Sequence, residues 1–187
     1  MSGLSSPLGT RQPVAVAGGL ALRDLSLQQR SGVRGAGASA YLVQQSYPVP
    51  NAPNQLVPTD SGAWVMSLSH REFWVLQPDQ EAAASAMHGE ALAAEVWPLY
   101  CQHGHAWLQL SGAPRAEVMA TLCGVDLSQA VFSEGSVVQT QVARVTSIIA
   151  HHAEGQAGVF SLFVDQSLAA YLWDALEDAI TAFRSST

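Results

Sequence analysis

The sequence predicts an α+β fold built from two diverged β-β-α-β-β-α units, each an antiparallel-rich sheet with helices on one face. Two observations predict it. Short apolar runs bounded by Gly, Pro or polar turn residues recur in the same order in both halves of the chain. Segments with helical spacing follow at matching places, and the last of them is clearly amphipathic. Sheets with helices packed on one face define the α+β class.

The boundaries of the two units follow from this repeat. Residues 1–12, which are rich in Gly and Ser, are expected to form a disordered tail. The first unit is predicted over residues 13–94 and the second over 95–187, packed together as one globular subunit. The alternative is two independent small domains, but the short join at residues 94–97 leaves little linker to separate them.

The first unit contains four predicted strands and two predicted helices. The strands are expected over apolar runs at residues 14–22, 31–34, 63–68 and 72–77. A short helix is expected over residues 38–44, and an Ala-rich helix after Pro78, with Asp79 as its N-cap. The link at residues 46–60 holds four prolines, so it can be neither a helix nor a central strand.

The second unit repeats this order. Its strands are expected at residues 96–102, 106–110, 137–151 and 159–164. Pro114 suits the first position of a helix that ends near Cys123, and an irregular link follows at residues 124–135. A hairpin is expected through residues 154–156. Gly35 and Gly112 occupy matching places in the two units, each where a strand passes into a helix that must approach the sheet closely.

The last helix has the clearest pattern in the chain, and Asp165 or Ser167 is expected to cap it. Its apolar side chains fall within one arc at 100° per residue: Leu168, Leu172, Ala175, Leu176, Ala179, Ile180 and Phe183. Its polar side chains fall opposite: Asp174, Glu177, Asp178 and Thr181. Trp173 lies at the border of the arc, where we expect its ring to be half covered by this chain and half by another.

The composition excludes several classes of function. All eight basic residues are Arg, and a chain without Lys can form no Schiff base with pyridoxal phosphate and has no phosphate-binding-loop lysine. The formal charge of −7 and the scattered arginines argue against a nucleic-acid partner. The run at residues 14–22 is too short to span a membrane. Charged residues make up only 12% of the chain, against about 25% in typical domains, which indicates a surface partly covered by partners.

Two groups of residues are candidates for a metal or catalytic site. Cys101, His103 and His105 alternate, so on a strand they would share one side, but three nearly collinear ligands suit tetrahedral coordination poorly. We therefore expect no metal site there, and we expect Cys101 and Cys123 to be reduced thiols of a cytoplasmic protein. The pair His151 and His152 is interpreted as a solvated strand end.

No recognised catalytic motif is present. A Gly-x-Ser-x-Gly nucleophile turn is absent, and no Gly-x-Gly-x-x-Gly follows a strand. The carboxylates Asp174, Glu177 and Asp178 lie on the outer face of the last helix, where solvation is expected. The sequence therefore predicts no catalytic, cofactor-binding or metal-binding residue in this chain.

Several runs in the right order resemble the gamma subunit of heterotetrameric sarcosine oxidase. They read RDLS at residues 23–26, GVRGAGA at 32–38, QTQVARV at 139–145, SLFV at 161–164 and YLW at 171–173. The resemblance spans about residues 20–183. It implies a bacterial, cytoplasmic complex of alpha, beta, gamma and delta subunits that oxidatively demethylates sarcosine to glycine, with the beta subunit as the main contact. It also implies that FAD, FMN, NAD, tetrahydrofolate and zinc belong to the partner subunits.

The gamma subunit is similar in turn to a shortened form of the folate-binding fold of the glycine cleavage T protein. Where that fold carries an Asn, a Gly-Gly pair and a catalytic Asp, residues 139–149 contain no Gly and no carboxylate. The resemblance therefore implies the fold without the folate-using base.

Two hypotheses remain: a structural subunit of the oxidase complex, or a stand-alone folate-binding module. For the first, Gln139, Thr140 and Arg144 are predicted partner contacts together with Trp173, because Thr140 and Arg144 share one side of the long predicted strand with Val142. The alternative for Arg144 is an internal bidentate salt bridge.

Overall fold

The computed structural model describes residues 5–15, 19–81, 92–155 and 157–185. Within these residues the chain forms two compact units. The first unit holds residues 27–104, and the second holds residues 5–26 together with 105–187. This division differs from the predicted one, 13–94 and 95–187, because the strand near the N-terminus joins the second unit and residues 95–104 join the first.

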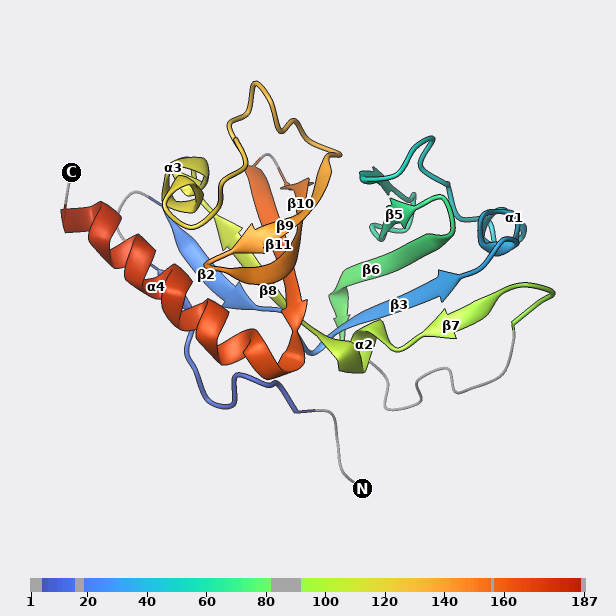
Figure 1. Ribbon diagram of the computed structural model, residues 1–187, viewed down its shortest axis with the longest axis horizontal. Helices are drawn as coiled ribbons and strands as arrows, with labels where there is room; N and C mark the ends of the chain where they lie inside the picture. Colours follow the sequence, from blue (N-terminus) through green and yellow to red (C-terminus); the bar gives the residue numbers. More distant parts are fainter. Residues whose placement is uncertain (1–4, 16–18, 82–91, 156, 186–187) are drawn as a thin grey trace. The chain divides into compact units, whose positions relative to one another are not determined.

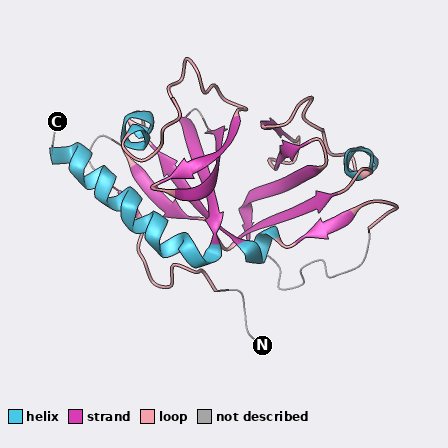
Figure 2. Ribbon diagram, viewed as in Figure 1, coloured by secondary structure: helices cyan, strands magenta, loops and turns pink. Residues whose placement is uncertain are grey.

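The first unit is a five-stranded antiparallel sheet with short helices (Figures 1 and 2). Its elements are β3 (Gln28–Arg34), α1 (Ala38–Gln44), β4 (Gln55–Pro58), β5 (Trp64–Ser69), β6 (Glu72–Glu81), β7 (Trp97–Leu99) and α2 (Cys101–Gly104). The strand order is β4-β5-β6-β3-β7. Its core lies between this sheet and α1, where Val33, Leu42, Val65 and Phe73 are buried.

The second unit is a six-stranded antiparallel sheet of order β1-β2-β8-β11-β10-β9. Its elements are β1 (Val14–Ala15), β2 (Ala21–Asp24), β8 (His105–Ser111), α3 (Arg115–Ala120), β9 (Val137–Val142), β10 (Val145–Glu154), β11 (Ala157–Asp165), the 3₁₀ turn η1 (Gln166–Leu168) and α4 (Ala169–Ser185). Helices α3 and α4 pack together, and α4 lies against β8 and β11 (Figure 1). The coarse prediction of an α+β fold with antiparallel sheets is confirmed.

The two sheets have the same internal order, with one strand exchanged. In chain order, β3-α1-β4-β5-β6 matches β8-α3-β9-β10-β11, and the paired orders β3-β6-β5-β4 and β8-β11-β10-β9 also match. The strand beside β3 is β7, which precedes β8 in the chain, and the strand beside β8 is β2, which precedes β3. Each unit thus takes the strand that leads into the other. Because β7 belongs to the first sheet, the first unit extends beyond the predicted boundary at residue 94.

Several predicted elements have the expected bounds. Helix α1 spans the predicted residues 38–44, and β5, β6, β8 and β11 lie where strands were expected. The proline-rich link contains one short strand, β4, at the edge of its sheet, where proline is tolerated. Asp165 caps the last helical segment, since its carboxylate accepts a hydrogen bond from the backbone N–H of Ser167 at 2.9 Å.

Four predicted elements are wrong in detail. The strand expected at 14–22 is instead the hairpin of β1 and β2, and the strand expected at 137–151 is split into β9 and β10. The strand expected at 96–102 ends at Leu99 and continues as the helical turn α2. Strand β6 runs through Pro78, so Asp79 is a strand residue and not an N-cap, while most of the helix predicted after it lies outside the described residues.

The N-terminal segment belongs to the second unit from residue 5 onward and places Leu8 in its core, contrary to the expected disordered tail over 1–12. Leu8 is 3% exposed and belongs to the buried cluster under α3 and α4. The hydroxyl of Ser6 donates a hydrogen bond to Asp24, and Arg11 forms an ion pair with Asp174 on α4 at 2.9 Å. Residues 1–4 lie outside the described part.

The amphipathic pattern of α4 is largely confirmed. Leu172, Leu176 and Ile180 are fully buried, while the predicted outer carboxylates are exposed. Two residues differ: Leu168 is 38% exposed, and Trp173 is only 1% exposed instead of half covered. The wide apolar face needed to cover a six-stranded sheet includes the border position that Trp173 occupies.

The matched glycines are points of close approach as predicted, but the neighbour is the backbone just before β7 or β2 and not a helix packed on the sheet. Gly35 has a φ of 143°, and a Cβ built there would lie 1.8 Å from the carbonyl oxygen of Glu95. Gly112 has a φ of 110°, and its Cβ would lie 2.6 Å from the carbonyl oxygen of Gly19. In the described part of the chain, no helix is both long and apolar enough to cross a membrane.

Candidate functional site

The predicted geometry of Cys101, His103 and His105 is wrong, because the first two lie in the helical turn α2 and not on a strand. Cys101 is buried, His103 is exposed, and no group of three or more His, Cys, Asp or Glu side chains in the described residues is placed to hold a metal ion. Burial raises the pKa of the Cys101 thiol to about 12, against a smaller opposing effect of Arg30. Cys101 therefore stays protonated and is a poor metal ligand.

The side chain of Arg30 is buried beside this turn, which the sequence analysis did not foresee. It is 3% exposed, and its Nε and Nη2 donate hydrogen bonds to the carbonyl oxygens of Cys101 and Gln102 at 3.1 and 3.2 Å. The side-chain oxygen of Gln102 accepts from the backbone N–H of Arg30 at 2.8 Å. The arginine thus caps the end of α2 and fixes it against β3.

His151 and His152 are both buried, at 1% and 2% exposure, so their interpretation as a solvated strand end is wrong. They point to opposite faces of β10, as neighbours on a strand must. The apolar run before them, Ile148 to Ala150, could have indicated this burial, since strands covered on both faces read as continuous apolar segments. Burial lowers the pKa of both imidazoles.

On one face, His151 is bound to the start of α3. A guanidinium N–H of Arg115 donates to His151 Nε2 at 3.0 Å, so the imidazole is neutral, and its Nδ1–H donates to the carbonyl oxygen of Phe132 at 2.7 Å. The guanidinium carbon lies 4.9 Å from the centroid of the Phe160 ring. Gly158 leaves the room for this cluster, because a Cβ there would lie 2.6 Å from Arg115 Nη2 and 2.7 Å from His151 Nε2.

On the other face, His152, Ser161 and Trp107 form a chain of hydrogen bonds. Trp107 Nε1–H donates to Ser161 Oγ at 2.8 Å. The nitrogen His152 Nδ1 lies 3.2 Å from the carbonyl oxygen of Ala153, which places the proton on Nδ1, so Ser161 Oγ–H donates to His152 Nε2 at 2.8 Å. A Ser–His pair of this kind resembles a nucleophile and its base. Ser161 is fully buried, however, so its hydroxyl cannot meet a substrate from solvent.

The four predicted contact residues are not brought together. Gln139 is exposed and Thr140 is half-buried on β9, where Thr140 shares a face with Val142 as predicted. Arg144 lies beyond the end of β9, in the turn to β10, so it does not continue that row. Trp173 is inside the core. Among the described residues Arg144 makes no ion pair, and the alternative of an internal salt bridge finds no support.

Two of the hollows lined by the described residues carry a carboxylate, and each of them lies within one unit. One, of about 640 Å³, is lined in the first unit by the end of α1 and the loops around β4. Its ionisable side chains are the carboxylate of Asp60 and the phenol of Tyr47. The other, of about 470 Å³, lies between α3 and the link after it and is lined by Arg115, Glu117 and Asp126. Asp126 accepts a hydrogen bond from the backbone N–H of Ser128 at 2.9 Å, which lowers its pKa. Arg115 is committed to His151, so neither hollow presents an acid beside a base.

Comparison with known proteins gives a consistent picture. The model of the family described as "Sarcosine oxidase, gamma subunit family" matches residues 36–182. A chain of the heterotetrameric sarcosine oxidase from Corynebacterium sp. U-96, solved in complex with pyrrole 2-carboxylate, is similar with a TM-score of 0.72 and 21% identity, over 91% of this chain and 88% of that chain. No curated protein sequence matches.

The second structural relative is the glycine cleavage system aminomethyltransferase T from Bartonella henselae. It is similar with a TM-score of 0.55 and 17% identity, over 83% of this chain but only 44% of that chain. The predicted relation to the T-protein fold is thus confirmed at the level of the fold. Because the family model matches most of its length, the chain belongs to the sarcosine oxidase gamma subunit family.

Proposed function

We propose that this chain is a non-catalytic structural subunit of a heterotetrameric sarcosine oxidase, which oxidatively demethylates sarcosine to glycine in a bacterial cytoplasm. The main support for the proposal is that the chain belongs to the gamma subunit family. The similar chain of known structure comes from a heterotetrameric sarcosine oxidase and is matched over 88% of its length. This chain therefore matches most of a chain that is found in such a complex, which supports a role in assembly.

The use of the polar side chains supports a non-catalytic role. The groups best suited to acid–base work, His151 and His152, are buried and engaged in hydrogen bonds at both ring nitrogens. A general base must reach the proton that it removes, directly or through one water. Each of these imidazoles instead stabilises the fold by pairing buried polar groups.

The proposal assigns the chemistry to the other chains. The alpha, beta and delta subunits are the proposed partners, with beta as the main contact. FAD, FMN, NAD, tetrahydrofolate and zinc are proposed to reside in those subunits. Segment 139–149, now seen as β9, a tight turn and half of β10, contains no carboxylate that could act on a folate.

Co-expression tests this proposal. The chain is produced with the alpha, beta and delta chains, one of which carries an affinity tag, and the purified material is analysed for stoichiometry and flavin absorbance. We expect this chain to co-purify at one copy per tagged chain, and to aggregate without bound flavin when it is produced alone. A stable isolated monomer with a flavin spectrum would contradict the proposal.

A second candidate is a stand-alone folate-binding module, which the similarity to aminomethyltransferase T favours. The chain spans less than half of that protein, so a complete folate site would have to be formed by this part alone. Calorimetry with tetrahydrofolate decides between the two: heat of binding to the isolated chain supports the module, and its absence at high protein concentration removes it.

A further inference from the structure

The turn between β9 and β10 holds two residues in a backbone conformation that L-amino acids disfavour. Val142 pairs with Val145, and between them Ala143 and Arg144 have φ values of 49° and 71°. Such two-residue turns, with both residues left-handed, strongly prefer Asn-Gly or Asp-Gly, because a Cβ is strained there. Strain of this kind persists where the surroundings enforce it, and it often marks functional positions.

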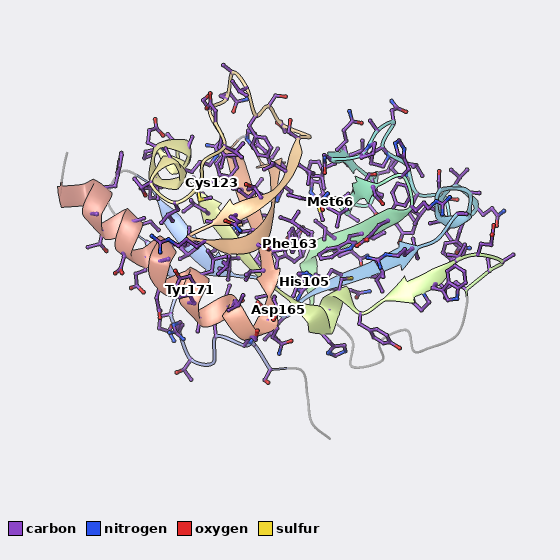
Figure 3. The ribbon with its side chains drawn as sticks, viewed as in Figure 1. Met66, His105, Cys123, Phe163, Asp165 and Tyr171 are labelled. Carbon is purple, nitrogen blue, oxygen red and sulfur yellow. The ribbon has the colours of Figure 1, made fainter. Side chains whose placement is uncertain are left out.

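The surroundings of the turn do enforce it. The backbone N–H of Ala143 donates to the carbonyl oxygen of Leu122 at 2.8 Å, just after α3. The side chain of Tyr171 projects from α4 (Figure 3), and its hydroxyl donates to the carbonyl oxygen of Ala143 at 2.9 Å. The turn is therefore tied to the segments of both helices that cover the sheet, and Arg144 is held in a defined place.

The guanidinium of Arg144 is presented to the outside. Arg144 is exposed and forms no ion pair or side-chain hydrogen bond with the described residues. Three other arginines form ion pairs within the chain: Arg11 with Asp174, Arg23 with Glu154, and Arg34 with Glu72. In a chain of net charge −7, where acidic side chains outnumber basic ones, an exposed arginine without such a pair is available to a carboxylate from elsewhere.

Apolar surface lies beside this cation. Tyr171 is 51% exposed while its hydroxyl is bonded to the turn, and Leu168, three residues before it, is 38% exposed. Tyr and Arg are the side chains most often found as binding hot spots when a partner covers them, and Arg takes a carboxylate in a two-point fork. The turn and the start of α4 together form what we call the Arg144 corner: Ala143, Arg144, Leu168 and Tyr171.

The first unit makes the comparable turn differently. Between β4 and β5 the left-handed position is filled by Gly62, with a φ of 82°, where no strain arises. The same strand order can thus be closed with glycine. The β4–β5 connection is longer, at residues 59–63, whereas the two-residue β9–β10 turn places Arg144 itself in the left-handed conformation.

We propose that the Arg144 corner docks another subunit of the oxidase complex, whose carboxylate side chain is bound by the guanidinium of Arg144 while its apolar surface covers Tyr171. This inference rests on the proposed function, and it adds the surface and the chemistry of the partner. It also keeps Arg144 as a contact residue while removing Trp173, whose indole is buried.

The test uses the co-expressed four-chain complex, with the tag on the partner that retains this chain, and measures how much of it stays bound as NaCl is raised. Three variants are compared with the wild type: Arg144→Gly, Arg144→Lys and, as a control for charge, Arg71→Ala in the exposed β5–β6 turn. Arg144→Gly is expected to weaken binding of this chain at least tenfold. Arg144→Lys is expected to weaken it less, because lysine keeps the charge but cannot form the two-point fork. Arg71→Ala is expected to weaken it by less than twofold.

A folding readout separates docking from structure. Because glycine relieves the left-handed strain, Arg144→Gly is expected to keep or raise the thermal midpoint of this chain, whereas loss of a structural arginine would lower it. Unchanged binding of Arg144→Gly, equal weakening by Arg71→Ala, or a lowered thermal midpoint that accounts for the weaker binding would each overturn the proposal. A wild-type chain that does not assemble would instead overturn the proposed function itself.

Discussion

The two units share a strand order but differ in what they bury. The sheet of the first unit packs apolar side chains against α1, a helix of two turns, and its buried polar side chains include Arg30 and Ser67. The sheet of the second unit is covered by α3 and the much longer α4, and it buries polar side chains on both faces, among them His151, His152 and Ser161. The comparison indicates that this strand order tolerates very different cores, provided that each buried polar group finds a partner.

The largest effect is expected from the second unit's helix core. Trp173→Ala removes a side chain that is 1% exposed and should destabilise the fold by roughly 3–5 kcal/mol, as for other buried aromatic truncations. Proteolysis of this chain in urea, carried out on the co-expressed complex, measures the loss of stability. The exposed neighbour Asp174 is no suitable control, because it pairs with Arg11, so Glu177→Ala on the outer face serves instead and should change stability by less than about 0.5 kcal/mol. Equal effects of the two would contradict the burial of Trp173.

The matched glycines test whether the two units depend on the same close approach. Gly35→Ala and Gly112→Ala should each cost about 2–3 kcal/mol or more, because the new Cβ meets a backbone carbonyl and φ is positive. Gly35→Ala is expected to be the worse, since its contact would be 1.8 Å against 2.6 Å. Thermal unfolding checks the order. Gly104→Ala, whose Cβ meets nothing within 4 Å, is the matched control and should be nearly neutral.

A smaller loss of stability is expected when the buried polar network of the second unit is disrupted. Ser161→Ala removes the hydroxyl that accepts from Trp107 and donates to His152, leaving two buried polar atoms without a partner. Such unpaired groups cost about 1–3 kcal/mol. Denaturant unfolding measures the loss, with Ser128→Ala in the exposed link as control. Covalent labelling of Ser161 in the wild-type chain by a phosphonate probe would show a reactive hydroxyl and would contradict the structural role.

The smallest effect is a dependence of stability on pH below about 7, which comes from the two buried imidazoles of the second unit. Burial lowers the pKa of His152 below its ordinary value of 6.5, so the unfolded chain binds a proton at a pH where the folded chain does not. Stability is then fully present above about pH 6.5 and declines as the pH falls below it, by at most about 1.4 kcal/mol per pH unit. Unfolding curves between pH 7.5 and 5 should show this decline, and His152→Gln should reduce it without abolishing it, because burial also lowers the pKa of His151.

Local patterns predicted much of the fold and little of the buried polar network. Helix α4, its Asp165 cap and the two glycines could be predicted because amphipathic spacing, capping and turn chemistry are local properties. The pairing of Arg115 with His151 could not, since residues 36 positions apart in the chain meet only when α3 folds onto the sheet. No sequence motif indicated the hydrogen-bonded pair of Ser161 and His152, which the fold brings together and buries.

The sequence by itself determined the fold class, the amphipathic last helix and the family, because the repeated local patterns and the ordered motifs can be recognised along the chain without knowing which residues are in contact. Only the tertiary structure decided the exchange of β2 and β7 between sheets, the hairpin at Ala143 and Arg144, and the burial of the two histidines. Each of these depends on which strand edge a segment meets. That choice is made by long-range pairing and close packing, which a periodic pattern along one strand does not encode.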